Sequence, residues 1–306
     1  MRPMSASSLS IRLLLGASLL AAMATSAVAQ GVAVERGRYL VTTIMACGNC
    51  HTPKDAEGRP VAGKELSGGG TGFDLPTFLG VAANITPDRE TGIGDWSDAE
   101  IKRTLTHGER PGHGPLAGKP LAAPMAANFF KAIVPGDLDA IVAYLRSVPA
   151  IRNVVTPPVY RAPVQREAFA TADRDFTEAD LTDKVRLGAY LATIGHCLEC
   201  HTPRGERGGL LLDTALGAGG RPFLPSFVKG LPASWKGSMS RNITADRERG
   251  IGAWSDAEIK RAITQGVGRD GRRMDEPMPY AWYAGLRGDD VDALVAYVRT
   301  LPALSR

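Results

Sequence analysis

Two segments of the chain place apolar residues at the spacing of a helix. Residues 137–150 read DLDAIVAYLRSVPA and residues 290–303 read DVDALVAYVRTLPA. Each has apolar side chains at positions i, i+3, i+4 and i+7, the pattern of an amphipathic helix packed on a core. They are Leu138, Ile141, Val142 and Leu145 in the first segment and Val291, Leu294, Val295 and Val298 in the second. No comparable alternating pattern indicates a strand, so we predict an all-α fold.

Two further helices are predicted in each half of the chain. One begins near Val34 in the first half and near Lys184 in the second, and both lead toward a pair of cysteines. The other begins with an S-x-x-E capping box, which satisfies free backbone N–H groups of the first turn, and stops at a glycine. The boxes are Ser97 with Glu100 and Ser255 with Glu258, and the stops are Gly108 and Gly266.

The chain also contains an internal repeat. Residues 84–103 (NITPDRETGIGDWSDAEIKR) and 242–261 (NITADRERGIGAWSDAEIKR) are identical at seventeen of twenty positions, at an offset of 158. The paired cysteines repeat at an offset of 150 and the final helices at 153. A period this long excludes a solenoid and indicates duplication of a complete globular unit.

The repeat and the length of 306 residues together predict two domains. We place them at residues 30–149 and 184–306. Residues 150–183 are rich in proline and show little periodicity, so we interpret them as an extended connector that lies over both domains. Hydrophobic residues make up 44% of the chain and charged residues 22%, which excludes wholesale disorder.

Residues 1–29 have the features of a secretory signal peptide. Arg2 and Arg12 supply positive charge, residues 13–23 are apolar but too few for a full bilayer crossing, and a small-residue A-V-A site precedes Gln30. An uncleaved anchor is the alternative. We expect export and a periplasmic location. The formal net charge is only +4, half of it from the leader, which favours neither a nucleic-acid nor a membrane-surface partner.

All four cysteines lie in two C-x-x-C-H motifs, the attachment motif of c-type haem. Each thiol of such a motif adds to one vinyl group of the porphyrin, and the histidine coordinates the iron. Zinc or a redox dithiol would compete as explanations of a single motif. Here the motif occurs twice, uses every cysteine and follows an export leader, so we predict two covalently bound haem c groups with their iron. The residues are Cys47, Cys50 and His51 in the first motif and Cys197, Cys200 and His201 in the second.

A methionine is the predicted second axial ligand of each iron. After the leader, the first half contains only Met45 and Met125, and Met45 is too close to a cysteine to reach the opposite face of the haem. Of Met239, Met274 and Met278 in the second half, only Met278 aligns with Met125, each preceded by proline. We expect Met125 and Met278 to complete His/Met coordination, the usual arrangement in cytochromes c. Methionines that only fill the core are the alternative.

Other histidines are weaker candidates. His113 lies in a Gly/Pro-rich loop and is either a surface residue or an alternative ligand of the first haem; the surface is favoured because Met125 has a counterpart in the repeat. His107 is expected at a solvated helix end, and His196 would point away from the iron beside it. The matched tryptophans are expected in the core or beside the haem; they are Trp96 and Trp254.

With these motifs, the chain resembles the class I cytochrome c family in its tandem dihaem form. It is similar to the cytochrome c subunits of periplasmic alcohol, aldehyde and sugar-acid dehydrogenases, several of which carry three haem sites where this chain has two. The resemblance implies two tandem class I cytochrome c-like helical domains with long loops around each haem. It rests on ACGNCHTP (46–53), HCLECHTP (196–203), the two NIT segments, GVGRDGRRMDEPMPY (266–280) and the two final helices.

The resemblance also implies particular contacts. The first and last helices of each domain would cross beside the haem. The carbonyl groups of Pro53 and Pro203 would accept the N–H of the haem-ligating imidazoles. The residues at the two crossings would be Gly37 and Tyr39 with Tyr144, and Gly188 and Tyr190 with Tyr297.

A haem iron with both axial positions filled by protein has no open position for substrate and is suited to moving one electron. We therefore predict an electron carrier or an electron-transfer subunit and not an enzyme. Its donor would be a periplasmic dehydrogenase, and its acceptor another cytochrome or a terminal oxidase. The alternative is a dihaem oxidoreductase, a peroxidase or a sulfur-compound oxidising enzyme, in which one haem is open. A c-type sensor module is a third hypothesis.

Overall fold

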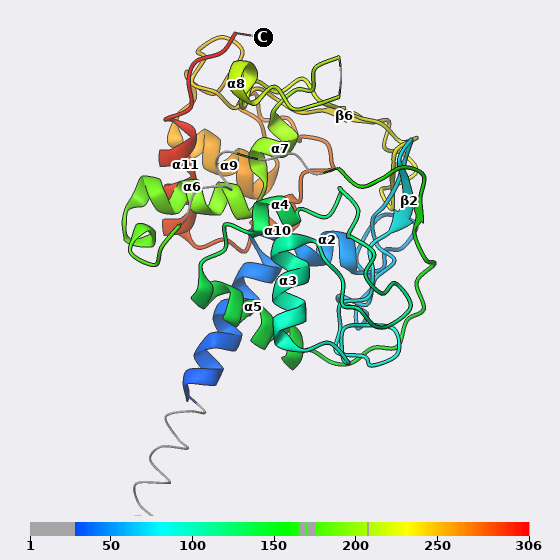
Figure 1. Cartoon of the computed structure of the whole chain (residues 1–306). Helices are drawn as coiled ribbons and strands as arrows, with labels where there is room; N and C mark the ends of the chain where they lie inside the picture. Colours follow the sequence, from blue (N-terminus) through cyan, green and yellow to red (C-terminus); the bar gives the residue numbers. More distant parts are fainter. Residues whose placement is uncertain (1–27, 166–168, 170–175, 207, 306) are drawn as a thin grey trace, which may run out of the picture.

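The computed structural model describes residues 28–165, 169, 176–206 and 208–305 (Figure 1). The predicted signal peptide lies almost entirely outside these residues. Residues 28–42 are helical. The first half continues with α2 (Cys47–His51), β1 (Gly72–Leu75), β2 (Phe78–Val81), α3 (Asp98–His107), α4 (Ala127–Phe130) and α5 (Pro135–Ser147).

The connector and the second half repeat much of this order. They contain β3 (Val159–Tyr160), the 3-10 turn η1 (Asp180–Thr182), α6 (Lys184–Ile194), α7 (Cys197–His201), α8 (Leu212–Ala215), β4 (Pro222–Phe223), β5 (Val228–Lys229), β6 (Ser238–Met239), α9 (Asp256–Gln265), α10 (Tyr280–Tyr283) and α11 (Gly288–Val298). Within the described residues, no helix is both long enough and apolar enough to cross a membrane.

The predicted helices are confirmed. Helices α5 and α11 cover the two amphipathic segments, and α3 and α9 begin with the expected capping boxes. In α3 the Ser97 hydroxyl accepts a hydrogen bond from the Glu100 N–H, while the Glu100 carboxylate accepts one from the Ser97 N–H. The same contacts start α9 at Ser255. Both helices stop at a glycine in the left-handed conformation, with φ of 68° at Gly108 and 64° at Gly266.

The all-α prediction is wrong in one respect, because the loops form two small sheets. The strand order is β3-β2-β1-β5 in one sheet, and β4 pairs with β6 in the other. The strands span only two to four residues, which is too short for an alternating pattern to stand out in the sequence. In the first sheet, Gly72 of the first half lies opposite Lys229 of the second half, so the sheet joins both halves with the connector.

In each half the first and last helices cross at a glycine. A Cβ atom added to Gly37 would lie 1.9 Å from the carbonyl oxygen of Ala140, and one added to Gly188 would lie 1.9 Å from that of Ala293. Only a residue without a Cβ allows backbones to approach this closely. Figure 1 shows α6 and α11 against one another. The crossings implied by the resemblance are confirmed for the glycines, whose added Cβ atoms would also contact Tyr144 and Tyr297.

Two tyrosine hydroxyls link the halves. Tyr39, on the helix of residues 28–42, donates a hydrogen bond to Asp290 on α11 (2.5 Å), and Tyr190 on α6 donates one to Asp137 on α5 (2.7 Å). The resemblance assigned both tyrosines to the crossing within their own half, whereas their hydroxyls bond to the last helix of the opposite half. The carboxylate of Asp137 that accepts from Tyr190 also forms an ion pair with Arg36, at 2.7 Å.

The connector segment contacts both halves. Strand β3 pairs with β2, with Val159 opposite Leu79. Further along, the ring of Phe176 lies 5.5 Å from the ring of Tyr190 on α6. A single cluster of buried apolar side chains runs through the two halves and includes Leu40, Phe129, Leu191 and Leu294.

Candidate haem-binding sites

The two C-x-x-C-H motifs form short helices of the same geometry. Helices α2 and α7 each span five residues, from the first cysteine to the histidine. Ala46 and His196 precede them in the left-handed conformation, with φ of 45° and 43°. Cysteines three positions apart on a helix lie on one face, so each helix presents both thiols to one side. All four cysteines are free, as the attachment of two haem groups requires.

The four thiols are partly withdrawn from water. Burial is the main cause that raises the pKa of Cys47 to about 12, of Cys197 to about 11 and of Cys200 to about 12, and it also raises the pKa of Cys50. The thiols are therefore neutral near pH 7. Each motif thus offers two reduced, neutral thiols, which are the groups that the two thioether bonds of one haem c would consume.

Each motif histidine is held by a backbone carbonyl group from a distant loop. The Nδ1 atom of His51 lies 2.7 Å from the carbonyl oxygen of Ala83, and Nδ1 of His201 lies 2.7 Å from that of Arg241. A carbonyl oxygen only accepts, so Nδ1 carries the proton. Burial lowers the pKa of both imidazoles and keeps them neutral. Nε2 of each ring then carries a free lone pair, and an imidazole in this form can ligate iron.

The carbonyl partners differ from those implied by the resemblance. Pro53 and Pro203 were expected to accept from the imidazoles. Their carbonyl groups instead accept backbone hydrogen bonds, from Val61 (2.8 Å) and Leu211 (3.0 Å). These bonds close the loop after each motif, which leaves the imidazoles to Ala83 and Arg241.

The NIT segments explain how the carbonyl groups are positioned. Asn84 follows Ala83 directly, is buried, accepts from the N–H and hydroxyl of Thr86, and donates to the carbonyl oxygen of Ile151 at 2.7 Å. Asn242 does the same with Thr244 and Leu304, at 2.6 Å for the last contact. The chain beyond the last helix of each half thus anchors the residue next to the histidine partner. Sequence reasoning missed Ala83 and Arg241, although the strongest repeat begins immediately after them.

The two proposed methionine ligands occupy matching places. Met125 and Met278 lie in tight turns directly before α4 and α10, are partly buried, and pack against the apolar core. Met239 is 63% exposed on β6, while Met45 is buried in the turn before the first motif. Met125 and Met278 thus occupy matching turns in the two halves, and their coordination of iron stays a prediction.

His113 and His107 lie at the surface, as the sequence favoured. His113 is at the surface, with a side chain 49% exposed, and pairs with Glu100 at 3.0 Å. His107 is exposed at the end of α3. The ring of His196 lies 6.2 Å from that of Phe129 and 6.5 Å from that of Phe130, both from the first half. The matched tryptophans, Trp96 and Trp254, are partly buried and pack against the core. This agrees with the interpretation that they are core residues.

Comparison with known proteins agrees with this geometry. Residues 185–302 match the cytochrome c family. This stretch, which contains the second C-x-x-C-H motif, is therefore similar to a cytochrome c domain. Domains of this family bind haem c covalently and serve electron transport. The first C-x-x-C-H motif lies outside the matched residues, but its helix, thiols and imidazole contact repeat those of the second motif.

Curated relatives include subunits of dehydrogenases. The gluconate 2-dehydrogenase cytochrome c subunit of Pantoea cypripedii is 28% identical over 314 residues, which cover 96% of this chain and 65% of that protein. The fructose dehydrogenase cytochrome subunit of Gluconobacter japonicus is 26% identical, over 99% of this chain and 60% of that protein. A diheme cytochrome c-type protein of Cereibacter sphaeroides is 28% identical, over 84% of this chain and 82% of its own length.

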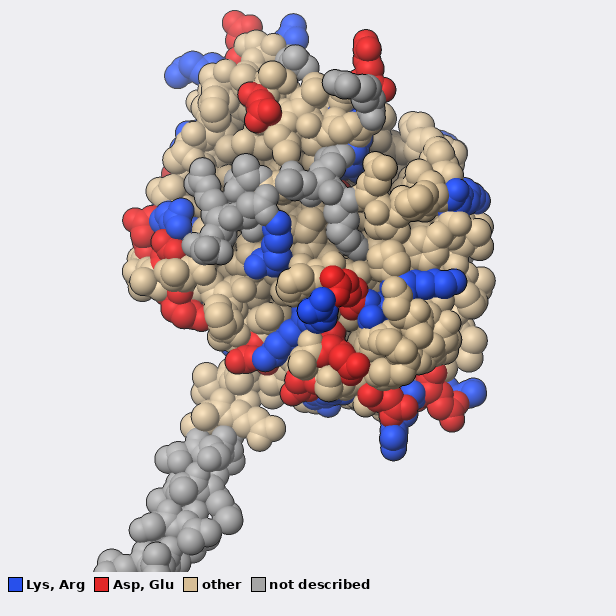
Figure 2. Space-filling view, viewed as in Figure 1, with Lys and Arg blue, Asp and Glu red and all other residues tan. Residues whose placement is uncertain are grey.

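The resemblance to cytochrome c subunits of dehydrogenases is thereby confirmed. The chain spans less than two thirds of the length of the gluconate and fructose dehydrogenase subunits. On the face shown in Figure 2, lysine and arginine side chains are interspersed with aspartate and glutamate, in keeping with the weak net charge.

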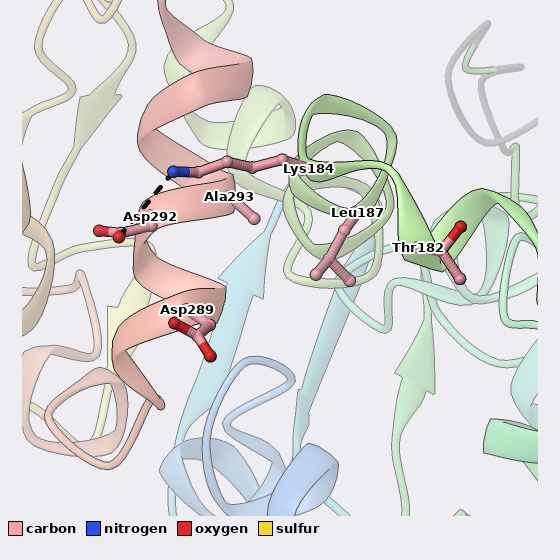
Figure 3. A pocket seen from close by; sticks show the side chains of 6 residues that line it. All are labelled: Thr182, Lys184, Leu187, Asp289, Asp292 and Ala293. Carbon is pink, nitrogen blue, oxygen red and sulfur yellow. Dashed lines mark ion pairs between the residues drawn. The ribbon is translucent and has the colours of Figure 1, made fainter.

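A separate pocket of about 240 Å³ opens between α6 and α11 (Figure 3). Lys184 on its rim lies 3.9 Å from Asp292. Neither cysteine motif contributes to the pocket, so it is not part of the candidate haem sites. Its lining residues are Thr182, Lys184, Leu187, Asp289, Asp292 and Ala293.

Proposed function

We propose that the protein is a periplasmic dihaem c-type cytochrome that transfers single electrons and is not itself an enzyme. One haem is attached at each C-x-x-C-H motif, with a histidine and a methionine as axial ligands. The attachment residues are Cys47 and Cys50, and Cys197 and Cys200; the ligands are His51 with Met125, and His201 with Met278.

One observation carries the proposal. In both halves the motif imidazole donates from Nδ1 to a carbonyl oxygen at 2.7 Å, which leaves Nε2 free for a metal. The first half reproduces this arrangement although it lies outside the residues matched to the family. The duplicated site supports two haem groups in place of one.

The proposed organisation follows the repeat. Two units, at residues 30–149 and 184–306, each supply one haem site, and residues 150–183 connect them. When bound, haem supplies reversible one-electron redox chemistry. The protein's part is to attach the group, orient the imidazole, supply the methionine and exclude a substrate from the iron.

The partners are proposed from the relatives and the leader. Relatives of this chain are named as cytochrome subunits of gluconate and fructose dehydrogenases, so a periplasmic dehydrogenase is the proposed donor. Another cytochrome or a terminal oxidase is the proposed acceptor. Export of residues 30–306 after removal of the leader would place all three in one compartment.

The test combines two measurements: the mass of the protein, which counts the covalently attached haem groups, and its absorption spectrum. Protein exported together with a haem-attachment system should carry two haem masses and show low-spin spectra with the methionine–iron charge-transfer band for both. Colourless protein or one haem per chain would contradict the proposal. Two haem groups with one high-spin centre would favour the dihaem oxidoreductase.

A further inference from the structure

Helix α10 packs on the cysteine motif of the opposite half. A Cβ atom added to Gly48, which lies between Cys47 and Cys50 on α2, would be 2.2 Å from Cη2 of Trp282. Gly48 is buried, so the indole fills the space that a side chain there would need. The matching position in α7 is Leu198, a large residue. The first motif is therefore shaped to receive Trp282.

The next residue on α10, Tyr283, is buried, and burial raises the pKa of its phenol well above the ordinary value. Cys197 and Cys200 of the second motif add smaller contributions to this shift. Trp282 and Tyr283 are consecutive, so one short helix carries a pair of aromatic side chains into the core shared by both halves. Helix α10 itself begins two residues after Met278.

The first half makes the reciprocal contact. Phe129 and Phe130 on α4 match Trp282 and Tyr283 at an offset of 153. Their rings lie 6.2 and 6.5 Å from the ring of His196, the residue before the second motif. In each half, the helix that follows the methionine thus contacts the other half, α10 at Gly48 within the first motif and α4 at the residue before the second motif.

A second, looser contact lies beside the first motif. A Cβ atom added to Gly285, just after α10, would lie 3.1 Å from Cγ2 of Thr43, four residues before Cys47. The tighter contact, 2.2 Å from the Gly48 position to Trp282, leaves no room for a water molecule between the indole and the first motif.

We propose that Trp282 is a positioning residue for electron exchange between the two haem sites, acting through its contact with Gly48. The inference rests on the proposed function, since it requires two attached haem groups. The step is the movement of one electron from the reduced to the oxidised site, with no bond or proton transferred. Closely packed atoms couple two redox centres more strongly than a gap does, and the Trp282–Tyr283 pair keeps this path packed.

Two substitutions disturb the contact from opposite sides. Trp282→Leu removes the ring but keeps an apolar side chain, and Gly48→Ala adds one methyl group that displaces the ring. In half-reduced protein, the rate of intramolecular electron exchange can be followed by NMR exchange between the two half-reduced forms. We expect both variants to slow this exchange severalfold while the two reduction potentials stay close to their original values. Trp282→Phe should restore part of the rate.

A matched control removes an aromatic ring elsewhere in the same half. Phe227 is 40% exposed at the edge of β5, and Phe227→Leu should leave the exchange unchanged. A second readout is the stability of the protein, measured as the midpoint of denaturation. Gly48→Ala should lower this midpoint in the original protein, because the added methyl group meets the indole. It should have little effect in the Trp282→Leu background, where the indole is absent.

The outcomes separate the two proposals. Two attached haem groups with unchanged exchange in both Trp282→Leu and Gly48→Ala would overturn the role of Trp282 and leave the proposed function standing. A chain with one haem would overturn the proposed function and this inference with it. If Trp282→Leu fails to fold, Gly48→Ala and Trp282→Phe decide the question.

Discussion

The hydroxyl of Tyr190 donates a hydrogen bond of 2.7 Å to the carboxylate of Asp137, although the two residues belong to different halves of the chain. Tyr39 and Asp290 form the reciprocal pair. Tyr39 and Tyr190 each lie on the helix that leads into a cysteine motif. The two bonds therefore fix how one haem site is placed relative to the other.

Replacing Tyr190 by Phe should destabilise the protein. Tyr190 is fully buried, and a buried hydrogen bond to a charged group contributes about 2 kcal/mol. Tyr39→Phe should cost less, about 1 kcal/mol, because that bond is partly exposed. Denaturant unfolding measures both. Tyr160→Phe is the control and should change stability least. The Tyr160 hydroxyl makes an exposed bond to the carbonyl oxygen of Pro120 and accepts one from Arg110, which also donates to the Lys119 and Pro120 carbonyls. Equal losses in all three variants would contradict the assigned role.

Removing either methionine should open one haem and leave the other closed. In Met125→Ala the first haem should bind carbon monoxide, and in Met278→Ala the second should, because an unfilled axial position accepts an external ligand. The absorption change on addition of carbon monoxide measures this, with Met239→Ala as the control because Met239 is 63% exposed. Failure of both variants to bind carbon monoxide would show that the ligand assignment is wrong.

The NIT anchors should affect both stability and the orientation of the imidazoles. Asn84→Ala leaves the Thr86 N–H without its acceptor and removes the shorter of two hydrogen bonds to the Ile151 carbonyl, at a cost of about 2 kcal/mol. Because Asn84 adjoins the carbonyl group that holds His51, the variant should also shift the electron paramagnetic resonance g-values of the first haem. Asn153→Ala loses a bond to Ser67 in the same region and should leave those g-values unchanged. Unaltered spectra in Asn84→Ala would count against the coupling.

The helix crossings should not tolerate a side chain. Gly188→Ala brings a Cβ atom to 1.9 Å from the Ala293 carbonyl oxygen, and overpacking against backbone costs about 3 kcal/mol or more. Gly288→Ala, at the start of α11, meets no atom within 4 Å and should be neutral or slightly stabilising. Thermal denaturation of the two variants compares them. A Gly188→Ala protein as stable as the original would refute the close crossing.

Acid should remove the contribution of Asp180. The hydrogen bond from Arg186, followed by those from Thr177, lowers the pKa of this carboxyl to about 2. A carboxyl whose pKa is depressed in the folded state stabilises it above the unfolded pKa of about 4. That contribution is lost as the pH falls toward 2. The difference in stability between the original protein and Asp180→Asn should therefore shrink steadily below about pH 4, and a constant difference would contradict the assignment.

Local chemistry determined what could be predicted from the sequence. The capping box of Ser97 with Glu100, the glycine stop at Gly108 and the amphipathic faces of α5 and α11 all depend on residues three or four positions apart. The C-x-x-C-H motifs belong to the same class, because thiols on one helical turn need no distant partner. Because the chain is duplicated, each of these features could be predicted in both halves, and aligning the halves paired Met125 with Met278.

Tertiary structure decided the contacts between segments that no local spacing relates. Ala83 and Arg241 lie 32 and 40 positions from the histidines they hold, and they act through backbone carbonyl groups that every residue possesses. Tyr190 with Asp137, and Trp282 against Gly48, join different halves. The short strands acquire their order only by pairing across the chain, as Gly72 does with Lys229. Such contacts form because burying apolar surface brings the two halves together, and which side chains then meet depends on the packing of the whole chain.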